Sequence, residues 1–307
     1  MASTEYHEPV LLHEAVRSLI TREDGLFVDG TLGGGGHCKL ILSKLGRNGR
    51  VFGIDHDEEA WEYASSVIGD DPRFTFIRGN FGHMEQLLPL DTHGKIDGIL
   101  LDLGVSSHQI DEPERGFMFR EDAPLDMRMS TLFGTTAFDV VNYHTEQQLK
   151  RIFKLYGEER NSSRIAREIV GKRPLETTGE LRQVIAGVTP ERHRNKTLAR
   201  IFQAIRIEVN RELEMLGRFF DKAPELVAEG GRLVVISYHS LEDRLTKNFM
   251  RAGNAEGKPE KDFYGNTIRP WKPVSNKPVI PDDKEISRNP RARSAKMRVA
   301  ERTGVTA

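Results

Sequence analysis

The chain has 307 residues, room for about two domains and for a core that needs neither disulfides nor a structural metal. Apolar residues make up 37% and charged residues 30%, a balance typical of soluble globular proteins. Lys and Arg number 45 against 46 Asp and Glu, and the resulting charge of −1 disfavours a non-specific nucleic-acid coat.

Membrane and secreted classes are also disfavoured. The longest uninterrupted apolar run, Leu233 to Ile236, has four residues, far fewer than a membrane span requires. The amino terminus has no basic stretch followed by an apolar core, so we expect no secretory signal. The single cysteine, Cys38, cannot form an internal disulfide. We therefore expect a cytoplasmic protein.

The first hundred residues alternate strand and helix patterns. Buried strands are predicted at Leu26–Val28, Val51–Ile54, Phe74–Ile77 and Ile96–Leu101, each followed by polar or glycine residues. Helix-length segments separate them, which indicates βαβ units and a parallel sheet in an α/β fold.

Helix signals dominate from about residue 113 to residue 208. Thr145 with Gln148 and Thr177 with Glu180 are typical of capping boxes, and one long apolar helix face is predicted from Leu198 to Phe220. We interpret 113–208 as an inserted helical domain, and 1–112 with 209–307 as one discontinuous domain.

The sheet pattern returns at Gly230–Ile236, which predicts a fifth strand. Residues 253–283 are rich in Gly, Pro, Asn and Lys and are expected to form a long loop. Lys296–Ala300 alternates apolar and charged residues, which predicts a final strand at or near an edge.

A glycine-rich segment, residues 30–36, lies between the first strand and the next helix. The dinucleotide fingerprint G-x-G-x-x-G, started at Gly33, would require a glycine where the chain has Cys38. A P-loop would require Lys and then Ser or Thr after Gly35, where the chain has Gly36-His37. Asp29 precedes the loop and no phosphate-binding lysine follows, which suits a cationic nucleoside such as S-adenosylmethionine. A side chain at Gly35 is expected to fill the space of the methionine part. A glycine-rich turn that binds nothing is the alternative.

Three further strand ends carry polar or aromatic candidates. Asp55 ends the second strand, where a carboxylate accepts both ribose hydroxyls of a nucleoside. Phe81 follows the third strand and either flanks an adenine ring or belongs to the core. Asp102 ends the fourth strand and is expected at the same edge as Asp29 and Asp55. The polar run that follows it, to Gln109, either separates cofactor from substrate or is a capped turn.

Other chemistries lack support in the sequence. The histidines form no H-E-x-x-H pattern and no cysteine pair exists, so no metal site is indicated. The segment Ser237-Tyr238-His239-Ser240 invites a hydrolase interpretation, but Ser240 is better suited to cap the next helix.

Two basic clusters favour a polyanionic partner. Five Lys or Arg residues lie between Arg192 and Arg206 without a carboxylate, and six lie between Arg288 and Arg302 beside one glutamate. For both clusters the alternative is a solvated surface. For the second cluster, a further alternative is that Arg291 or Arg293 braces the sheet by pairing with a carboxylate such as Glu242 or Asp243. The RNA-binding candidates are Arg194, Lys196, Arg291, Arg293 and Arg298.

Nearly the whole chain resembles the bacterial small-subunit ribosomal-RNA cytosine-N4 methyltransferase family, called RsmH or MraW. The segments that carry the resemblance are long and occur in order: His7-Glu8-Pro9-Val10-Leu11-Leu12, Asp29-Gly30-Thr31 with Gly35-Gly36-His37, Lys95 to Ser107, Glu114-Arg115-Gly116-Phe117, Pro124 to Met129, Tyr156 to Arg160, Phe202 to Ile207, Ser237 to Arg244, and Asn289 to Ser294.

The resemblance implies a class I (Rossmann-like) S-adenosylmethionine-dependent methyltransferase with an inserted all-helical, substrate-recognition domain. It implies methyl transfer from S-adenosylmethionine to N4 of a cytidine in the decoding region (P site) of 16S rRNA, within the small ribosomal subunit. The resemblance leaves open whether the protein forms a homodimer. The cofactor contacts that it implies fall on Gly35, Gly36, His37, Asp55, Phe81, Asp102 and Gln109.

The wider class of amino methyltransferases commonly carries Asp/Asn/Ser-Pro-Pro-Tyr/Phe after the fourth strand, whereas this chain has Asp102-Leu103-Gly104-Val105. The amine-holding arrangement of that class therefore cannot be transferred, and Asp102 is our catalytic candidate. Methylation of another amine, and a catalytically silent ribosome-assembly factor, remain the alternatives.

Overall fold

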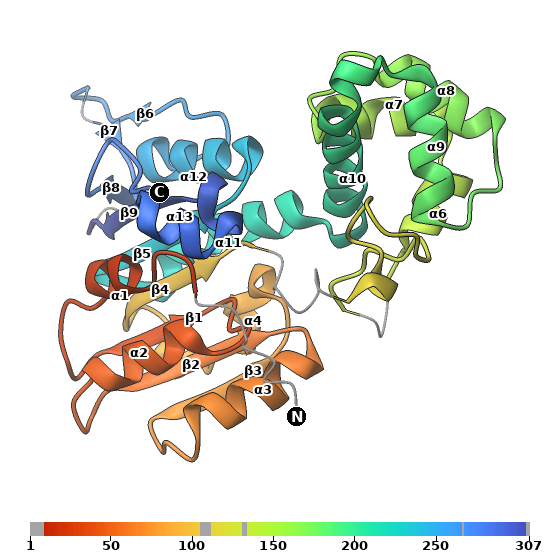
Figure 1. Ribbon diagram of the computed structural model, residues 1–307. Coiled ribbons are helices and arrows are strands. Elements are labelled where there is room, and N and C mark those ends of the chain that lie inside the picture. Colours follow the sequence, from red (N-terminus) through yellow and green to blue (C-terminus); the bar gives the residue numbers. More distant parts are fainter. Residues whose placement is uncertain (1–8, 105–111, 131–133, 266, 305–307) are drawn as a thin grey trace. The chain divides into compact units, whose positions relative to one another are not determined.

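The computed structural model describes residues 9–104, 112–130, 134–265 and 267–304 and divides the chain into two units (Figure 1). The sheet unit comprises Met1–Gly104 and Leu213–Ala307, and the helical unit comprises Val105–Glu212. Each unit has its own hydrophobic core.

A seven-stranded sheet forms the centre of the sheet unit, in the order β3-β2-β1-β4-β5-β9-β8. The first five of these strands in that order are parallel, and β9 and β8 are antiparallel additions beside β5. The bounds are β1 (Leu26–Asp29), β2 (Arg50–Asp55), β3 (Phe74–Arg78), β4 (Ile96–Asp102), β5 (Val227–Ser237), β8 (Trp271–Pro273) and β9 (Lys296–Arg302). The predicted α/β fold with a parallel sheet is confirmed.

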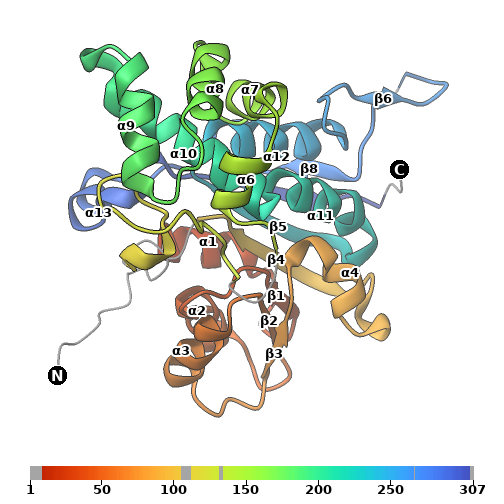
Figure 2. The same cartoon turned by 90° about the vertical axis from the view of Figure 1, so that its right-hand side faces the viewer.

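Alternating side chains divide the sheet's core between its two faces. Along β4, Leu100 packs with one cluster of buried residues while Ile99 and Leu101 pack with the other. Helices α1, α2 and α3 supply apolar residues to the first cluster, and α4, α11 and α12 supply them to the second (Figure 2). Burial on both faces is why the central strands are nearly continuous apolar runs.

The helices of the sheet unit lie before and between its strands along the chain. Their bounds are α1 (Leu12–Leu19), α2 (Gly36–Lys44), α3 (Glu58–Ile68), α4 (Met84–Leu87), α11 (Glu212–Leu226), α12 (Ser240–Ala252) and α13 (Asp283–Arg288), with the 3-10 turns η1 (Phe81–His83), η2 (Leu90–Thr92) and η5 (Pro290–Ser294). Among the helices in the described part of the chain, none is both long and apolar enough to cross a membrane.

The structure corrects the expected long loop at residues 253–283. This segment contains β6 (Glu260–Lys261), β7 (Thr267–Ile268) and β8. Trp271 on β8 is completely buried, so one large apolar side chain holds the strand to the sheet. A strand of three residues carries too little periodic signal to be recognised from sequence.

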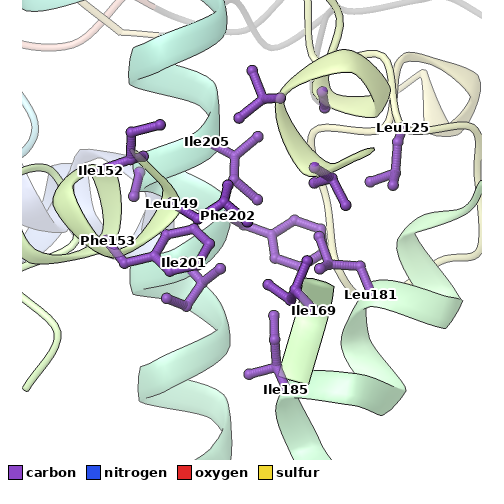
Figure 3. Packing of buried hydrophobic residues seen from close by; sticks show 14 of the residues in the cluster. Leu125, Leu149, Ile152, Phe153, Ile169, Leu181, Ile185, Ile201, Phe202 and Ile205 are labelled. Carbon is purple, nitrogen blue, oxygen red and sulfur yellow. The ribbon is translucent and has the colours of Figure 1, made fainter. Parts of the chain in front are cut away.

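The helical unit is built around a core to which α6, α7, α8, α9 and α10 all contribute (Figure 3). Their bounds are α6 (Ala137–Tyr143), α7 (Glu146–Leu155), α8 (Ser162–Gly171), α9 (Thr178–Val188) and α10 (Arg194–Asn210), with η3 (Pro113–Arg115) and η4 (Glu191–His193). Both predicted capping boxes are confirmed: Thr145 and Thr177 accept from the backbone N–H groups of Gln148 and Glu180, whose side chains accept in return.

The prediction of one long helix from Leu198 to Phe220 is wrong. Arg211 adopts a left-handed conformation with φ 52° and ψ 34°, which ends α10 at Asn210 and lets α11 begin at Glu212. The apolar spacing continues through the break, so periodicity alone could not reveal it.

Candidate active site

Three carboxylates lie at the carboxyl ends of neighbouring strands. Asp29 ends β1, Asp55 ends β2 and Asp102 ends β4, and β1 lies between the other two. Burial raises the pKa of Asp29 most, and the nearby charges of Asp102 and Asp55 raise it as well. The predicted gathering of these three residues at one edge is therefore observed.

The glycine-rich loop is fastened to both strands that flank β1. The backbone N–H of Gly33 donates to Asp55 Oδ2 at 2.8 Å. On the other side, the backbone N–H of Asp102 donates to Thr31 Oγ1 at 2.6 Å. Thr31 was part of the recognised motif but had no role assigned, and the structure shows that its hydroxyl links the ends of β1 and β4.

Gly35 is required by the backbone and by a close approach to α3. It precedes α2 in a left-handed conformation with φ 75°. A Cβ at this position would lie 3.1 Å from the Ala64 Cβ and 3.3 Å from the Ile68 Cδ1, both on α3. A Cβ here would therefore contact α3. That a side chain also fills the ligand's space stays a prediction.

Gly36 and His37 are held against the segment that precedes α1. A Cβ on Gly36 would clash with the Pro9 ring, so only glycine fits there. His37 Nε2 lies 3.2 Å from the carbonyl oxygen of Val10, and because a carbonyl only accepts, Nε2 carries the proton. Burial lowers the pKa of His37 to about 4, so the ring is neutral at pH 7.

Asp29 is almost fully buried, with 1% of its surface exposed. Its Oδ1 accepts from the backbone N–H of Thr31 at 3.3 Å, while Oδ2 finds no hydrogen-bond partner among the described residues. Desolvation by burial, followed by the nearby carboxylates, raises the pKa of Asp29 to about 7. An acceptor without a donor is costly in the interior, so this oxygen is suited to a cationic or donating ligand.

Asp102 shares this character. Burial, with a smaller contribution from the charge of Glu242, raises its pKa to about 6, although hydrogen bonds from the Tyr238 hydroxyl and the Gly104 backbone lower it. Its Oδ2 lies 3.9 Å from His37 Nδ1, too far for a hydrogen bond, and its Oδ1 is buried without a partner in the described chain.

Tyr238 packs closely beside Asp102. A Cβ on Gly104 would lie 2.8 Å from the Tyr238 Cε2, so the absence of a side chain at Gly104 leaves room for the ring. Burial, and then the charge of Asp102, raise the pKa of the Tyr238 hydroxyl well above its usual value, so it remains a donor. Sequence reasoning treated this residue as part of a helix cap and missed it, because its partner lies far away in the chain.

The cap of α12 is His239, not Ser240 as expected. His239 Nδ1 accepts from the Glu242 backbone N–H at 3.4 Å, and Glu242 Oε2 accepts from the Tyr238 backbone N–H at 2.9 Å. The helix therefore begins at Ser240, one residue beyond its cap.

Asp55 and Phe81 both have structural partners. Besides Gly33, the Asp55 carboxylate accepts from the Asp57 backbone N–H at 2.9 Å, and burial raises its pKa. The Phe81 ring is half-buried and meets Phe219 edge-on, with centroids 6.1 Å apart. Gln109, the remaining candidate cofactor contact, lies outside the described residues.

Comparison with known proteins identifies the family of this chain. A model of the MraW methylase family matches residues 4–303. The chain belongs to the MraW methylase family. Proteins named ribosomal RNA small subunit methyltransferase H are similar to it along nearly their whole length. That of Bacteroides fragilis (strain ATCC 25285) is 51% identical over 302 residues, covering 97% of this chain and 98% of the relative. That of Flavobacterium johnsoniae is 52% identical over 301 residues, with the same two shares covered.

One further relative and one solved structure are also similar to this chain. The relative of the same name from Cytophaga hutchinsonii is 48% identical over 300 residues, covering 97% of this chain and 99% of that protein. Among solved structures, a putative rRNA-methylase from Clostridium thermocellum aligns with 96% of this chain and 94% of its own, at 12% identity and a TM-score of 0.45.

The basic candidates of this MraW methylase family member differ in their surroundings. In the sheet unit, Arg291 and Arg293 are exposed on η5, whereas the Arg298 side chain is 11% exposed and pairs with Asp243. Its Nε and one terminal nitrogen donate to the two Asp243 oxygens at 2.7 and 3.3 Å. Bracing of the sheet through Asp243 is therefore observed for Arg298.

In the helical unit, Arg194 and Lys196 lie in the first turn of α10, whose amino terminus has no side-chain cap. Lys196 is exposed and Arg194 is half-buried.

Proposed function

We propose that this protein transfers a methyl group from S-adenosylmethionine to N4 of a cytidine in the decoding region of 16S rRNA, within the small ribosomal subunit. The observation that carries the proposal is the pair of buried acceptor oxygens without partners, on Asp29 and Asp102, at adjacent strand ends. The name of the relatives supports ribosomal RNA of the small subunit as the substrate class. Such a substrate also favours a cytoplasmic location.

The residues at the strand ends fit S-adenosylmethionine. Asp29 Oδ2 would accept from the α-amino group, a cation that offsets the cost of burying the carboxylate. Asp55 would accept from the ribose hydroxyls through its remaining lone pairs, and Phe81 would flank the adenine. The loop at Gly35–His37, with Gln109, would contact the rest of the cofactor. When bound, the cofactor supplies an electrophilic methyl group on its sulfonium.

Asp102 would orient the target amine. The N4 lone pair of cytosine is conjugated with the ring, so the enzyme must hold the amine in line with the methyl group and stabilise charge as the nitrogen becomes pyramidal. Asp102 Oδ1 would accept an N4 hydrogen and then the proton that N4 loses. A pKa of about 6 is near the range in which a group both accepts and releases a proton at neutral pH. The Tyr238 hydroxyl would hold the carboxylate in position.

The cytidine must be unpaired or flipped, because N4 is engaged in a Watson–Crick duplex. We assign Arg194, Lys196, Arg291 and Arg293 to the RNA backbone, and the helical segment 113–208 to substrate recognition. Replacing Arg291 and Arg293 together with Gln should weaken RNA binding and flatten its salt dependence, since fewer counterions are released. An unchanged salt slope would remove these two residues from the interface.

A transfer assay with small ribosomal subunits from a strain lacking this enzyme tests the proposal. Purified protein with methyl-labelled S-adenosylmethionine should place label on one cytidine at N4, as measured by nucleoside mass spectrometry. The Asp102→Asn variant should lose transfer while the fold survives. A protein that binds the subunit but shows no S-adenosylmethionine binding by calorimetry would instead be an assembly factor, and label on another amine would refute the assigned position.

A further inference from the structure

A short hairpin projects from the sheet unit beyond α12 (Figures 1 and 2). Its strands, β6 and β7, pair antiparallel, with Glu260 opposite Ile268. The Gly265 backbone N–H donates to the Asp262 carbonyl at 3.0 Å, which closes a four-residue turn, and the Asp262 carboxylate accepts from the Tyr264 backbone N–H at 2.9 Å. Phe263 and Tyr264 therefore occupy the two central positions of the turn.

Both aromatic side chains are almost fully exposed, Phe263 at 97% and Tyr264 at 85%. Their ring centroids are 5.5 Å apart and the planes are nearly perpendicular, at 86°. Gly, Pro, Asn and Asp are the usual residues at the centre of a turn, each for a conformational reason that an aromatic residue does not share. The folding of the hairpin thus gives no reason for two aromatic residues here, which indicates that they serve a partner.

The base of the hairpin is held by buried and hydrogen-bonded residues. Trp271 follows β7 and is completely buried in the sheet unit's core. On the other side, an Arg251 guanidinium N–H on α12 donates to the Gly257 carbonyl at 2.9 Å, and Asn248 donates to the Ala255 carbonyl at 2.7 Å. The exposed rings are therefore carried on an anchored support.

We propose that Phe263 and Tyr264 form a stacking platform for unpaired bases of the ribosomal RNA substrate, an inference that rests on the function proposed above. Base–aromatic stacking requires only one accessible ring face for each base, and every base has such a face. Two exposed lysines that precede the rings in the sequence, Lys258 and Lys261, are suited to the flanking phosphates.

A protein partner fits these observations less well. A specific protein interface buries about 800 Å² on each side, around an apolar centre. The tip of the hairpin has only two apolar rings, which lie in the sequence between Asp262 and Gly265 and follow the charged residues Glu260 and Lys261. This apolar surface is too small for the centre of such an interface. The other exposed large apolar side chains of this segment, Val274, Val279 and Ile280, follow β8 and are not part of the hairpin.

The test measures RNA affinity by fluorescence anisotropy, with a labelled unstructured oligoribonucleotide and a blunt duplex of the same sequence as probes. The full-length protein is compared with the double variants Phe263→Ala/Tyr264→Ala and Phe263→Leu/Tyr264→Leu. The leucines keep apolar surface but have no planar ring. Each affinity is measured across a salt series, with thermal melting and S-adenosylmethionine binding as controls for folding.

Both double variants should bind the single strand about tenfold to a hundredfold more weakly than the wild type, with an unchanged salt slope because no charge is removed. Duplex affinity, melting and cofactor binding should be unchanged. The matched variant Lys258→Gln/Lys261→Gln should instead reduce the salt slope. Wild-type affinity in the leucine variant, or an equal loss for the duplex, would overturn the stacking role while leaving the proposed function intact. A wild-type protein that binds no RNA would overturn both.

Discussion

The affinity for S-adenosylmethionine should depend on pH through Asp29. The pKa of this carboxyl is raised to about 7 by burial, so in the free protein at pH 5.5 most molecules carry it protonated and neutral. A cationic amine at Oδ2 favours the ionised form and lowers the pKa. Binding should therefore release a proton at acid pH, and affinity should fall as the pH falls.

The size of the effect follows from the linkage between protonation and binding. If only the ionised form binds tightly, lowering the pH from 7 to 5.5 should weaken the affinity about fifteenfold, or about 1.6 kcal/mol. Over this range a ligand α-amino group with a pKa near 7.7–8.0 stays mostly protonated, so its own titration contributes little. Proton release at pH 6 should approach about 0.9 per site.

Isothermal titration calorimetry in two buffers of different ionisation enthalpy measures both the affinity and the released protons. Asp29→Asn is the matched variant, because the amide oxygen can still accept from the Thr31 backbone N–H. It should bind more weakly at pH 7 and lose most of the pH dependence. The pH dependence that remains in this variant would come from the titration of Asp102 and Asp55, whose pKa values are also raised. A flat wild-type profile, or an equally steep profile in Asp29→Asn, would refute the assignment of Asp29 to the amine.

Three further outcomes are expected. Asp55→Ala should weaken binding of S-adenosylmethionine and S-adenosylhomocysteine equally, by about 1.5–3 kcal/mol, and a loss confined to one ligand in calorimetry would contradict a ribose role. Tyr238→Phe removes a hydrogen bond that lowers the pKa of Asp102, so the acid limb of the pH–kcat profile should move to higher pH; a lowered kcat with an unmoved limb would assign Tyr238 to structure alone. Arg298→Gln should lower stability by about 1–3 kcal/mol in thermal melting, since Asp243 loses its main partner, and leave the salt slope of RNA binding unchanged; a flattened slope with normal melting would place Arg298 at the RNA.

Local signals predicted much of this fold. Strands buried on both faces leave apolar runs that end in polar residues, so the ends of β1, β2 and β4 could be located before their side chains were seen together. Capping boxes act within four residues, and both were recognised correctly. Family membership was recognised from long ordered motifs.

Features that depend on contacts distant in sequence could not be predicted. The break at Arg211 is a backbone conformation with no breaker residue to mark it. The direction of a Cβ at Gly35 depends on where α3 packs. Arg298 pairs with Asp243, which lies 55 positions away in the sequence. The local cluster of basic residues therefore suggested that Arg298 binds RNA, whereas in the fold it binds a carboxylate. The hydrogen bond between Tyr238 and Asp102 likewise joins the ends of two strands.

The central claim is that the carboxylates at the strand ends support methyl transfer to one cytidine N4 of 16S rRNA. Mass spectrometry of 16S rRNA nucleosides from a deletion strain, complemented with either the wild-type gene or Asp102→Asn, tests it most directly. N4-methylated cytidine should be absent from the deletion strain, return with the wild type, and stay absent with Asp102→Asn expressed at the same level. Full N4 methylation in the deletion strain, or none after wild-type complementation, would contradict the account.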